Sequence, residues 1–207
     1  MAWNIDPWED GSVLEEEVCD ECLVLEGSVI RSCRFVQCSF RSARWIEVVT
    51  DRCEFEECDF TGARLGSSVH QHSSFLNCKF IDADLYGAAF DTCRMVGCNF
   101  AGASFSDLKV TKGDWSYVQM RMLALDGLDF SGTKLEGADF YGSSLVKAVL
   151  NRAVLTRANL GHADLREADL RGADLSGAIL QDAKVKGARM GVEQAIVFSA
   201  SCGIVIE

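Results

Sequence analysis

The sequence predicts an all-β protein built as a quadrilateral parallel β-helix. The first observation is a large apolar residue at every fifth position: of the 34 multiples of five from 25 to 190, only Thr50 and His70 are not apolar. The second is a small residue two places earlier, since 28 of the 34 positions from 23 to 188 are Ala, Cys, Ser, Gly or Thr. The third is that this spacing never slips, so no loop interrupts it.

A period of five residues fits neither an α-helix nor an ordinary strand. In each repeat of five, two residues point inward and three point outward. This pattern fits a short extended segment that ends in a corner and forms one side of a four-sided coil. Four such sides close a coil of about 20 residues, and stacked coils pair backbone to backbone at roughly 4.8 Å. Each coil buries its core only against its neighbours. The expected organisation is an acidic arm or cap at 1–18, the β-helix at 19–190, and a helix and strand at 191–207.

The acidic N-terminal arm is expected to cover the first coil with Trp3, Trp8 and Leu14. Residues 1–26 hold nine acids and no Lys or Arg, and this charge would discourage end-to-end stacking. Contact between the arm and a partner protein is the alternative interpretation.

Seven cysteines occupy the small inward position, which predicts two buried columns. Residues 20 apart lie on one side of the coil, so Cys38, Cys58, Cys78 and Cys98 should stack beside Phe40, Phe60, Phe80 and Phe100. The second column contains Cys33, Cys53, Ser73 and Cys93. Such cysteines act as small buried apolar residues rather than as a disulfide framework. The CDEC segment at 19–22 supplies one C-x-x-C pair, but a zinc site needs further ligands at suitable spacing, and none follows.

Two places depart from the pattern inside the repeat. Thr50 and His70 should point inward from adjacent coils, which predicts a bulged or solvent-leaking corner. Segment 106–130 places Leu or Val at four small positions, so a bend, a wider coil or a changed turn is expected there. A surface feature for a partner is the alternative for this segment.

The C-terminal segment abandons the five-residue period after Met190. Ala195, Phe198, Ser199 and Cys202 lie at helical spacing, Val192 and Ile196 widen the stripe, and Gly203 fits a helix stop. Residues 204–206 are typical of a short strand. This apolar surface predicts a two-fold interface, and a simple cap is the alternative. The expected interface residues are Val192, Ala195, Ile196, Phe198, Cys202, Ile204 and Ile206.

Composition and charge narrow the function classes. The chain has 207 residues and a net charge of −11, and it lacks the basic face that nucleic-acid binders usually show. No apolar run is long enough for a membrane span, and the N-terminus does not resemble a signal peptide, so a cytoplasmic location is expected. His72 and His162 have no partner in any recognisable catalytic motif. We therefore expect that the protein is not an enzyme and that it binds no cofactor or metal ion.

The residues resemble those of the pentapeptide-repeat proteins, whose consensus is A(D/N)LXX. The stretch ADLREADLRGADLSGA is close to that consensus, and the resemblance spans about residues 23–190. It implies a right-handed β-helix. Within the family, the C-terminal segment resembles the MfpA and Qnr type through Gln194, Ala195, Gly203, Ile204 and Ile206. Because the Qnr branch carries loops and this chain has none, the chain is more similar to the MfpA branch.

That resemblance implies a C-terminal homodimer that binds DNA gyrase and either inhibits it or protects it from quinolones. A slender acidic solenoid would resemble duplex DNA in shape, without direct contact to nucleic acid or membrane. The most acidic side of the coils is predicted to contain Glu54, Glu56, Glu57, Asp114, Glu136 and Asp174. The alternative is a non-enzymatic scaffold or interaction module unrelated to gyrase. Self-protection of a producer of a topoisomerase poison is a third interpretation.

Overall fold

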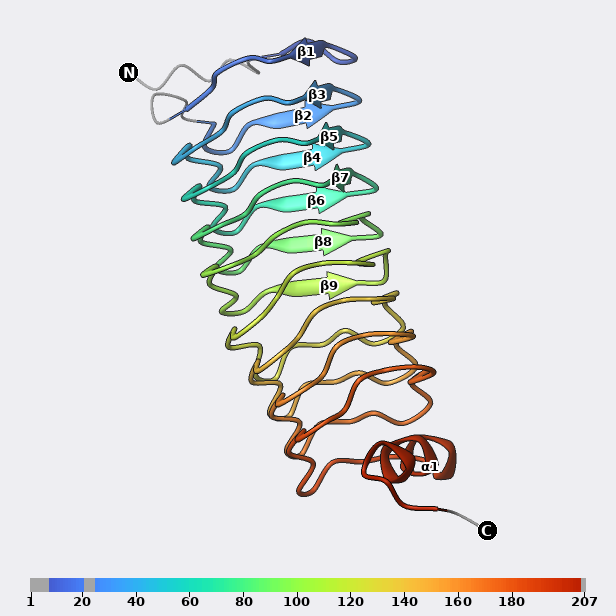
Figure 1. Ribbon diagram of the computed structural model, residues 1–207. Coiled ribbons are helices and arrows are strands. Elements are labelled where there is room, and N and C mark those ends of the chain that lie inside the picture. The colour runs from blue at the N-terminus through green and yellow to red at the C-terminus, as the bar shows by residue number, and fades with distance from the viewer. Residues whose placement is uncertain (1–7, 21–24, 206–207) are drawn as a thin grey trace. The chain divides into compact units, whose positions relative to one another are not determined.

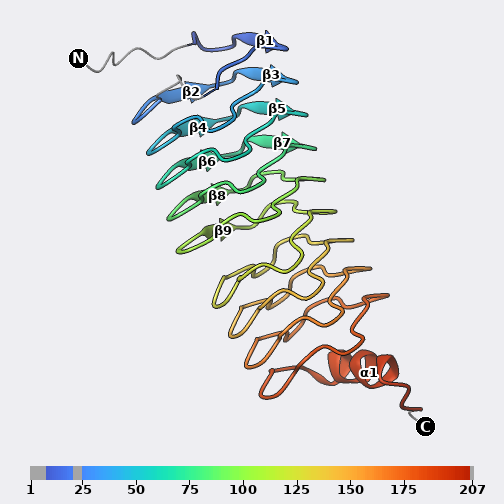
Figure 2. The ribbon, with the colours of Figure 1, turned by 60° about the vertical axis from the view of Figure 1, so that its left-hand side comes forward.

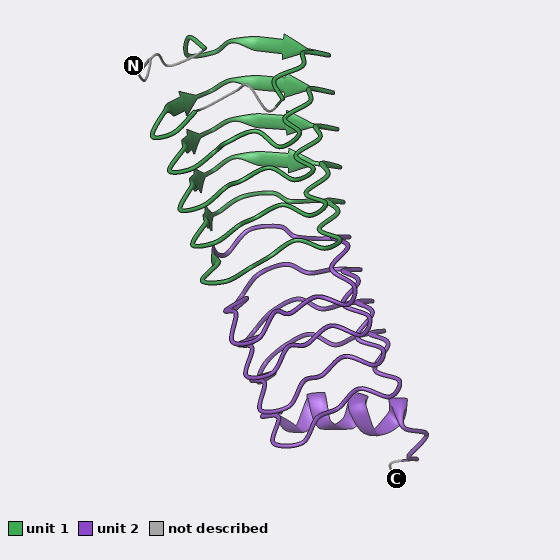
Figure 3. Cartoon of the chain, turned by 90° about the vertical axis from the view of Figure 1, so that its left-hand side faces the viewer, with its two compact units in different colours: residues 1–109 green, residues 110–207 purple. Residues whose placement is uncertain are grey.

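The computed structural model describes residues 8–20 and 25–205. The chain forms two compact units, residues 1–109 and residues 110–207, which are coloured separately in Figure 3. Each unit is a stack of β-solenoid coils (Figures 1 and 2). The predicted β-helix fold is thus confirmed within each unit.

In the first unit, short parallel strands form two of the four sides. One sheet has the order β1 (Val13–Glu15), β3 (Arg34–Val36), β5 (Glu54–Glu56) and β7 (Ser74–Leu76). The other contains β2 (Val29–Arg31), β4 (Val49–Asp51), β6 (Val69–Gln71) and β8 (Ala89–Asp91). Lys109, the first residue of β9 (Lys109–Thr111), donates its N–H to the carbonyl of Ala88 at 2.9 Å. Isolated parallel bridges make the remaining sides, as in the series Ser39, Asp59, Lys79 and Asn99.

In the second unit all four sides are ladders of parallel bridges between residues 20 apart. The ladders are Asp114–Lys134–Val154–Asp174, Gln119–Asp139–Asn159–Ile179, Ala124–Ser144–Asp164–Lys184 and Asp129–Val149–Asp169–Arg189. This spacing is the coil length that the sequence predicts.

The core of each coil consists of the large residues at multiples of five. Phe35, Phe55 and Phe75 stack with ring centroids 4.8 and 4.6 Å apart. The column Phe40, Phe60, Phe80 and Phe100 stacks at 4.9, 4.9 and 5.0 Å. These spacings are close to the distance between adjacent strands, so each coil contributes one ring to each column.

The corners share a backbone conformation that the five-residue pattern did not reveal. Every fifth residue from Gly27 to Gly187 has a positive φ. At a typical corner Ser42 has a φ of 55°, and the N–H of Ala43 closes the turn on the carbonyl of Phe40 at 3.2 Å. This geometry requires a left-handed residue at the third turn position, which glycine adopts without strain. Twelve of the 18 glycines occupy this position, and that enrichment was the available signal.

The irregular segment 106–130 keeps its large side chains inside. Leu108, Val118, Leu123 and Leu128 are at most 8% exposed, so the coil interior accommodates two large residues on a side. The corner at Leu123 uses the same kind of side-chain acceptor as the corner at Cys53 in a regular coil, so it is not a turn peculiar to this segment. There the N–H of Leu123 goes to the hydroxyl of Ser143 at 3.1 Å, and that hydroxyl donates to the carbonyl of Met120.

The N-terminal segment joins the solenoid as a strand. β1 pairs with β3 in parallel, with Leu14 opposite Phe35, and the ring of Trp8 packs edge-on against Phe35 at 4.9 Å. The coil of residues 8–20 therefore covers the next coil, which contains Phe35, through Trp8 and Leu14, whereas Trp3 lies outside the described residues. Coil geometry begins before residue 19, with a spacing of 21 residues rather than 20.

The predicted C-terminal helix is present as α1 (Val192–Ser201). It ends at Gly203, whose φ is 78°, with the Gly203 N–H on the Ala200 carbonyl and the Ile204 N–H on the Ser199 carbonyl. This is the Schellman arrangement, and it confirms Gly203 as the helix stop. Ile204 and Val205 do not form the strand expected at 204–206, and Ile206 lies outside the described residues.

Candidate functional site

The buried histidine belongs to a satisfied polar cluster in the core. His70 is fully buried, its Nδ1 lies 2.8 Å from the Thr50 hydroxyl, and its Nε2 lies 3.0 Å from the Ser68 hydroxyl. Thr50 also contacts Ser73 at 3.2 Å, and the His70 ring stacks on Phe90. Burial lowers the pKa of His70 to about 3, so the imidazole is neutral. The expectation of a bulged corner was wrong, because Thr50 and His70 are regular partners in β4 and β6.

The cysteine columns are confirmed, and they have a backbone role. At corners without the closing turn bond, the inward N–H needs another acceptor. The Ser73 hydroxyl accepts the N–H of Cys53 at 3.1 Å and donates to the carbonyl of Gln71. Cysteine thiols occupy the same small inward position as the Ser73 hydroxyl. The Cys58 thiol, for example, lies within hydrogen-bond distance of the carbonyls of Phe35 and Glu56 and donates to them. The seven inward cysteines are buried and free.

No metal centre is found among residues 8–20 and 25–205, in the sense that no three His, Cys, Asp or Glu side chains are grouped there for a metal ion. Within the CDEC segment, Cys19 is half-buried, and burial raises the pKa of its thiol to about 11. Cys22 lies outside the described residues. The same part of the chain contains no helix with the length and apolar character of a membrane span.

Three predicted acidic residues lie together on the first unit. Glu54 and Glu56 flank Phe55 in β5, and Arg34 of the adjacent β3 contacts both carboxylates, at 3.5 and 3.0 Å. Glu57, at the following corner, accepts a hydrogen bond from Gln37 at 2.8 Å. Glu54 and Glu57 are exposed and Glu56 is half-buried, and Arg34 offsets part of the charge of the group.

The other three predicted acidic residues lie on one side of the second unit. Asp114 and Glu136 both contact the Lys134 ammonium at 3.4 Å, and Arg157 pairs with Glu136. Asp174 accepts hydrogen bonds from the hydroxyls of Ser176 and Thr156. The Ser176 hydrogen bond holds the pKa of Asp174 below its usual range. Each unit therefore carries a mixed charge network rather than a bare acidic stripe.

The first coil carries the largest uncompensated negative charge. Residues 8–20 contain Glu9, Asp10, Glu15, Glu16, Glu17 and Asp20 and no Lys or Arg. Glu15, Glu16 and Glu17 are exposed, at the end of β1 and just after it. Among the described residues, none of these three forms an ion pair.

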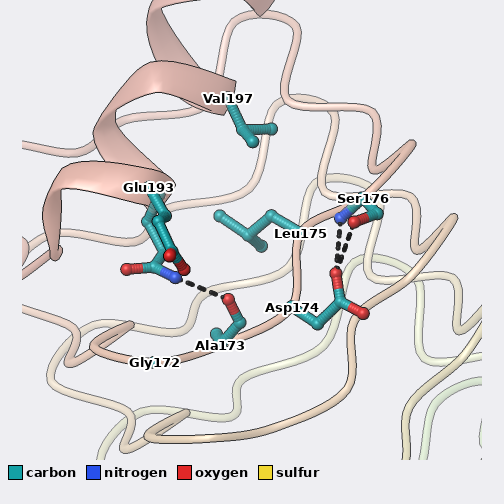
Figure 4. Close-up of a pocket in the computed structure, with 8 residues that line it drawn as sticks. Gly172, Ala173, Asp174, Leu175, Ser176, Glu193 and Val197 are labelled. Carbon is teal, nitrogen blue, oxygen red and sulfur yellow. Dashed lines mark hydrogen bonds between the residues drawn. The ribbon is translucent and has the colours of Figure 1, made fainter.

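The C-terminal surface is formed by α1 against the last coil. Gln194 anchors the helix, donating from Nε2 to the carbonyl of Ala173 at 2.8 Å. Val197 and Glu193 overhang a shallow cleft that is also lined by Leu175 and Asp174 (Figure 4). The opposite helix face is open, because Val192 and Ile196 are 79% and 46% exposed.

The predicted interface residues fall into three groups. Val192, Ala195, Ile196, Cys202 and Ile204 are exposed, so they are available to a partner. Phe198 is half-buried and lines a second cleft with Leu180 and Ala183. Ile206 lies outside the described residues. The last coil adds the half-buried Val185 and Met190 and the exposed Ile179 to this end.

Solved structures with a similar fold include QnrB1, described as a plasmid-mediated fluoroquinolone resistance protein. Three QnrB1 structures match 95% of this chain and 99–100% of their own, with TM-scores of 0.76 to 0.83 and identities of 19–20%. HetL from the cyanobacterium Nostoc, a protein involved in regulating heterocyst differentiation, matches 87% of this chain and 90% of its own, with a TM-score of 0.55 and 25% identity.

No curated protein sequence is similar enough to this chain to count as a match. The family model for pentapeptide repeats matches residues 53–95, 125–160 and 153–191, in eight copies. These ranges cover more than half of the chain and coincide with the coils described above. The chain therefore belongs to the pentapeptide-repeat family.

Proposed function

We propose that this protein binds DNA gyrase at its DNA-binding surface in the cytoplasm, as a C-terminal homodimer, and inhibits the enzyme or protects it from quinolones. The likeness to QnrB1 along nearly the whole chain supports this proposal. So does the exposed apolar surface on α1, which fits a second copy. No covalent chemistry by this chain is required.

The observation that carries the proposal is the acidic first coil. A surface that normally holds DNA is basic, and it attracts carboxylates that have no cation of their own. Glu15, Glu16 and Glu17 fit this requirement, whereas Glu54 and Glu56 share Arg34. We therefore place the principal contact at residues 8–20, with the acidic side of the coils as a weaker contribution.

The direct test is a gyrase supercoiling assay with and without a quinolone. Micromolar protein is expected either to inhibit supercoiling or to restore it in the presence of drug. The variant Glu15→Gln/Glu16→Gln/Glu17→Gln should weaken this effect at least tenfold.

The matched control is Glu54→Gln/Glu56→Gln/Glu57→Gln, which removes the same formal charge from the coil side. It should weaken the effect by less than threefold, because Arg34 already offsets part of that charge. An unchanged effect in the first variant would contradict the contact, and no effect of the wild-type protein would contradict gyrase binding.

A scaffold or interaction module is the second candidate function. The ion-paired coil sides favour it, since a network such as Asp114, Lys134 and Glu136 resembles an ordinary solvated protein surface. Affinity capture with the full chain decides between the two. Recovery of gyrase supports the first function, and recovery of another partner without gyrase supports the second.

A further inference from the structure

The net negative charge of the chain is not shared between its two units. Residues 1–109 contain 19 acids and nine bases, a net charge of −10. Residues 110–207 contain 12 acids and 11 bases, a net charge of −1. The negative charge of the whole chain therefore disfavours nucleic-acid binding by the first unit, but not by the second unit, which is nearly neutral.

Within the second unit, cations gather on two adjacent sides of the last coils. These are the sides of the ladders Ser144–Asp164–Lys184 and Val149–Asp169–Arg189. Their segments 144–152, 164–172 and 184–189 hold seven bases and three acids, a net charge of +4. We call this surface the basic side; all its cations are exposed, and they are Lys147, Arg152, Arg166, Arg171, Lys184, Lys186 and Arg189.

The three acids of the basic side are already engaged. Asp164 pairs with Arg166 at 2.7 Å and lies opposite Lys184 in the ladder. Asp169 pairs with Arg171 at 2.6 Å and lies opposite Arg189. Glu167 faces Lys147 at 3.8 Å. Each aspartate thus has one cation as an ion-pair partner and a second cation beside it in the ladder, and an excess of positive charge remains.

Four cations of the basic side have no carboxylate within ion-pair distance among the described residues: Arg152, Lys184, Lys186 and Arg189. Lys186 also lies one coil, or roughly 4.8 Å of backbone, from Arg166. Both residues lie in turns at the same corner of successive coils, where like charges this close repel each other. This local cost is typical of a surface that meets an external anion.

The remaining side chains of the basic side identify that anion. Segments 144–152, 164–172 and 184–189 contain no aromatic residue, so they offer no platform on which single-stranded bases could stack. Their only β-branched apolar residues, Val146, Val149 and Val185, are half-buried, so the anchors of a protein interface are missing. Arginine and lysine on a regular backbone fit phosphates.

We propose that the basic side of the second unit binds the sugar–phosphate backbone of duplex DNA without reading its base sequence. The proposal does not depend on gyrase. It assigns the second unit an activity separate from that of the acidic first unit, because the basic side and the unpaired acids of residues 8–20 lie on different parts of the chain.

Fluorescence anisotropy of a labelled 30-base-pair duplex with the full-length protein tests this. Four phosphate contacts predict that log K falls with log salt at a slope of about −3.6, a loss of roughly 150-fold between 50 and 200 mM salt. The variant Arg152→Ala/Lys186→Ala should reduce the slope to about −1.8. The control Lys79→Ala/Arg94→Ala removes two exposed cations from the first unit and should leave the slope unchanged.

Three results would overturn the proposal. The first is no binding at 50 mM salt with 50 µM protein. The second is an equal loss in the control variant, which would assign binding to general charge. The third is tighter binding of a polyglutamate peptide or of single-stranded DNA than of the duplex, which would assign the surface to another class of partner.

Discussion

At the scale of single residues, His70 couples the stability of the fold to pH. The unfolded chain protonates this imidazole near its ordinary pKa of 6.5, whereas burial lowers the pKa in the folded chain to about 3. The unfolded state therefore binds the extra proton between these values. The free energy of unfolding therefore has its full value above pH 6.5 with respect to this group, and it decreases as the pH falls from 6.5 toward 3.

We predict that this single group makes the free energy of unfolding fall by about 1.4 kcal/mol per pH unit below pH 6.5. Urea unfolding between pH 7 and pH 5 measures the slope. The variant His70→Phe, which can stack on Phe90 but cannot titrate, should be nearly flat over this range. An equal slope in both proteins would contradict the assignment to His70.

The cysteine columns predict a second residue-scale result, which concerns thiol reactivity. Burial raises the pKa of the Cys53 thiol to about 11 and that of Cys93 to about 12, and the thiolate is the reactive form. Cys202 is exposed at the end of α1. Iodoacetamide at pH 8 should therefore label Cys202 in the folded protein and spare the inward cysteines until denaturant is added.

Mass spectrometry of peptides locates the label. The variant Cys202→Ser serves as the control, because it should remove the label at this position without exposing the columns. Labelling of Cys58 or Cys78 in the native protein would contradict the buried arrangement.

At the scale of elements, α1 depends on one buried amide for its attachment. In earlier coils the carbonyl at the small position accepts an N–H from the next coil, as Ala153 does from Asp174 at 2.9 Å. No coil follows Ala173 at this corner, and Gln194 supplies the hydrogen bond instead. Its Oε1 also accepts the N–H of Gly191 at 3.1 Å, which orders the first turn of the helix.

We predict that Gln194→Ala lowers the free energy of unfolding of α1 by about 1–3 kcal/mol, because the substitution leaves a buried carbonyl without a donor. Hydrogen exchange of the α1 amides should accelerate, while exchange in the coils should not change. Glu193→Ala is the matched control, since this neighbouring side chain is exposed. Equal exchange in both variants would contradict the anchoring role.

Most of the coil architecture was predictable because the interior is narrow. In the regular coils a large residue such as Phe55 stands beside a small one such as Cys53, and this alternation is visible in the sequence. The left-handed backbone of the corners was not predicted, because many of these positions hold residues such as Ser42, and only the glycine enrichment marks the position. The polar cluster around His70 was misjudged for a related reason: sequence shows a polar intrusion but not the Thr50, Ser68 and Ser73 hydroxyls that satisfy it.

The acidic side was only partly predictable from the sequence. Spacing of 20 residues brought Glu56 and Asp174 to definite sides of their coils. The same spacing places Arg34 beside Glu54 and Lys134 beside Asp114, but it does not show that each cation also reaches a second carboxylate, on Glu56 or Glu136. Counting charge along a sequence therefore overestimates the free negative charge of a solenoid side.

At the scale of the whole molecule, the net charge differs between the two units. The free acids of residues 8–20 belong to the first unit, and the basic side belongs to the second. Gyrase assays with the Glu15 to Glu17 variant and DNA binding with the Arg152 and Lys186 variant therefore probe different parts of the chain. Each variant should leave the other assay unchanged.

The homodimer is a further prediction at this scale, and the structure decides which substitution tests it cleanly. A charge at Phe198 would disturb the packing of α1 on Leu180 and Ala183 as well as any interface. Ile196 lies on the open face of the helix, where 46% of it is exposed. Ile196→Asp therefore changes the surface without removing a residue that holds the helix in place.

Light scattering after size-exclusion chromatography should show a dimer of the wild-type chain at 10 µM and a monomer of Ile196→Asp, because an apolar interface does not accommodate an unpaired carboxylate. At protein concentrations low enough for the dimer to dissociate, the wild-type chain and Ile196→Asp should unfold at the same midpoint temperature. Met122→Asp is the matched control, since Met122 is 73% exposed and lies outside the helix; this variant should remain dimeric. A monomeric wild-type chain would remove the interface, and an equal loss of dimer in both variants would place it elsewhere on the second unit.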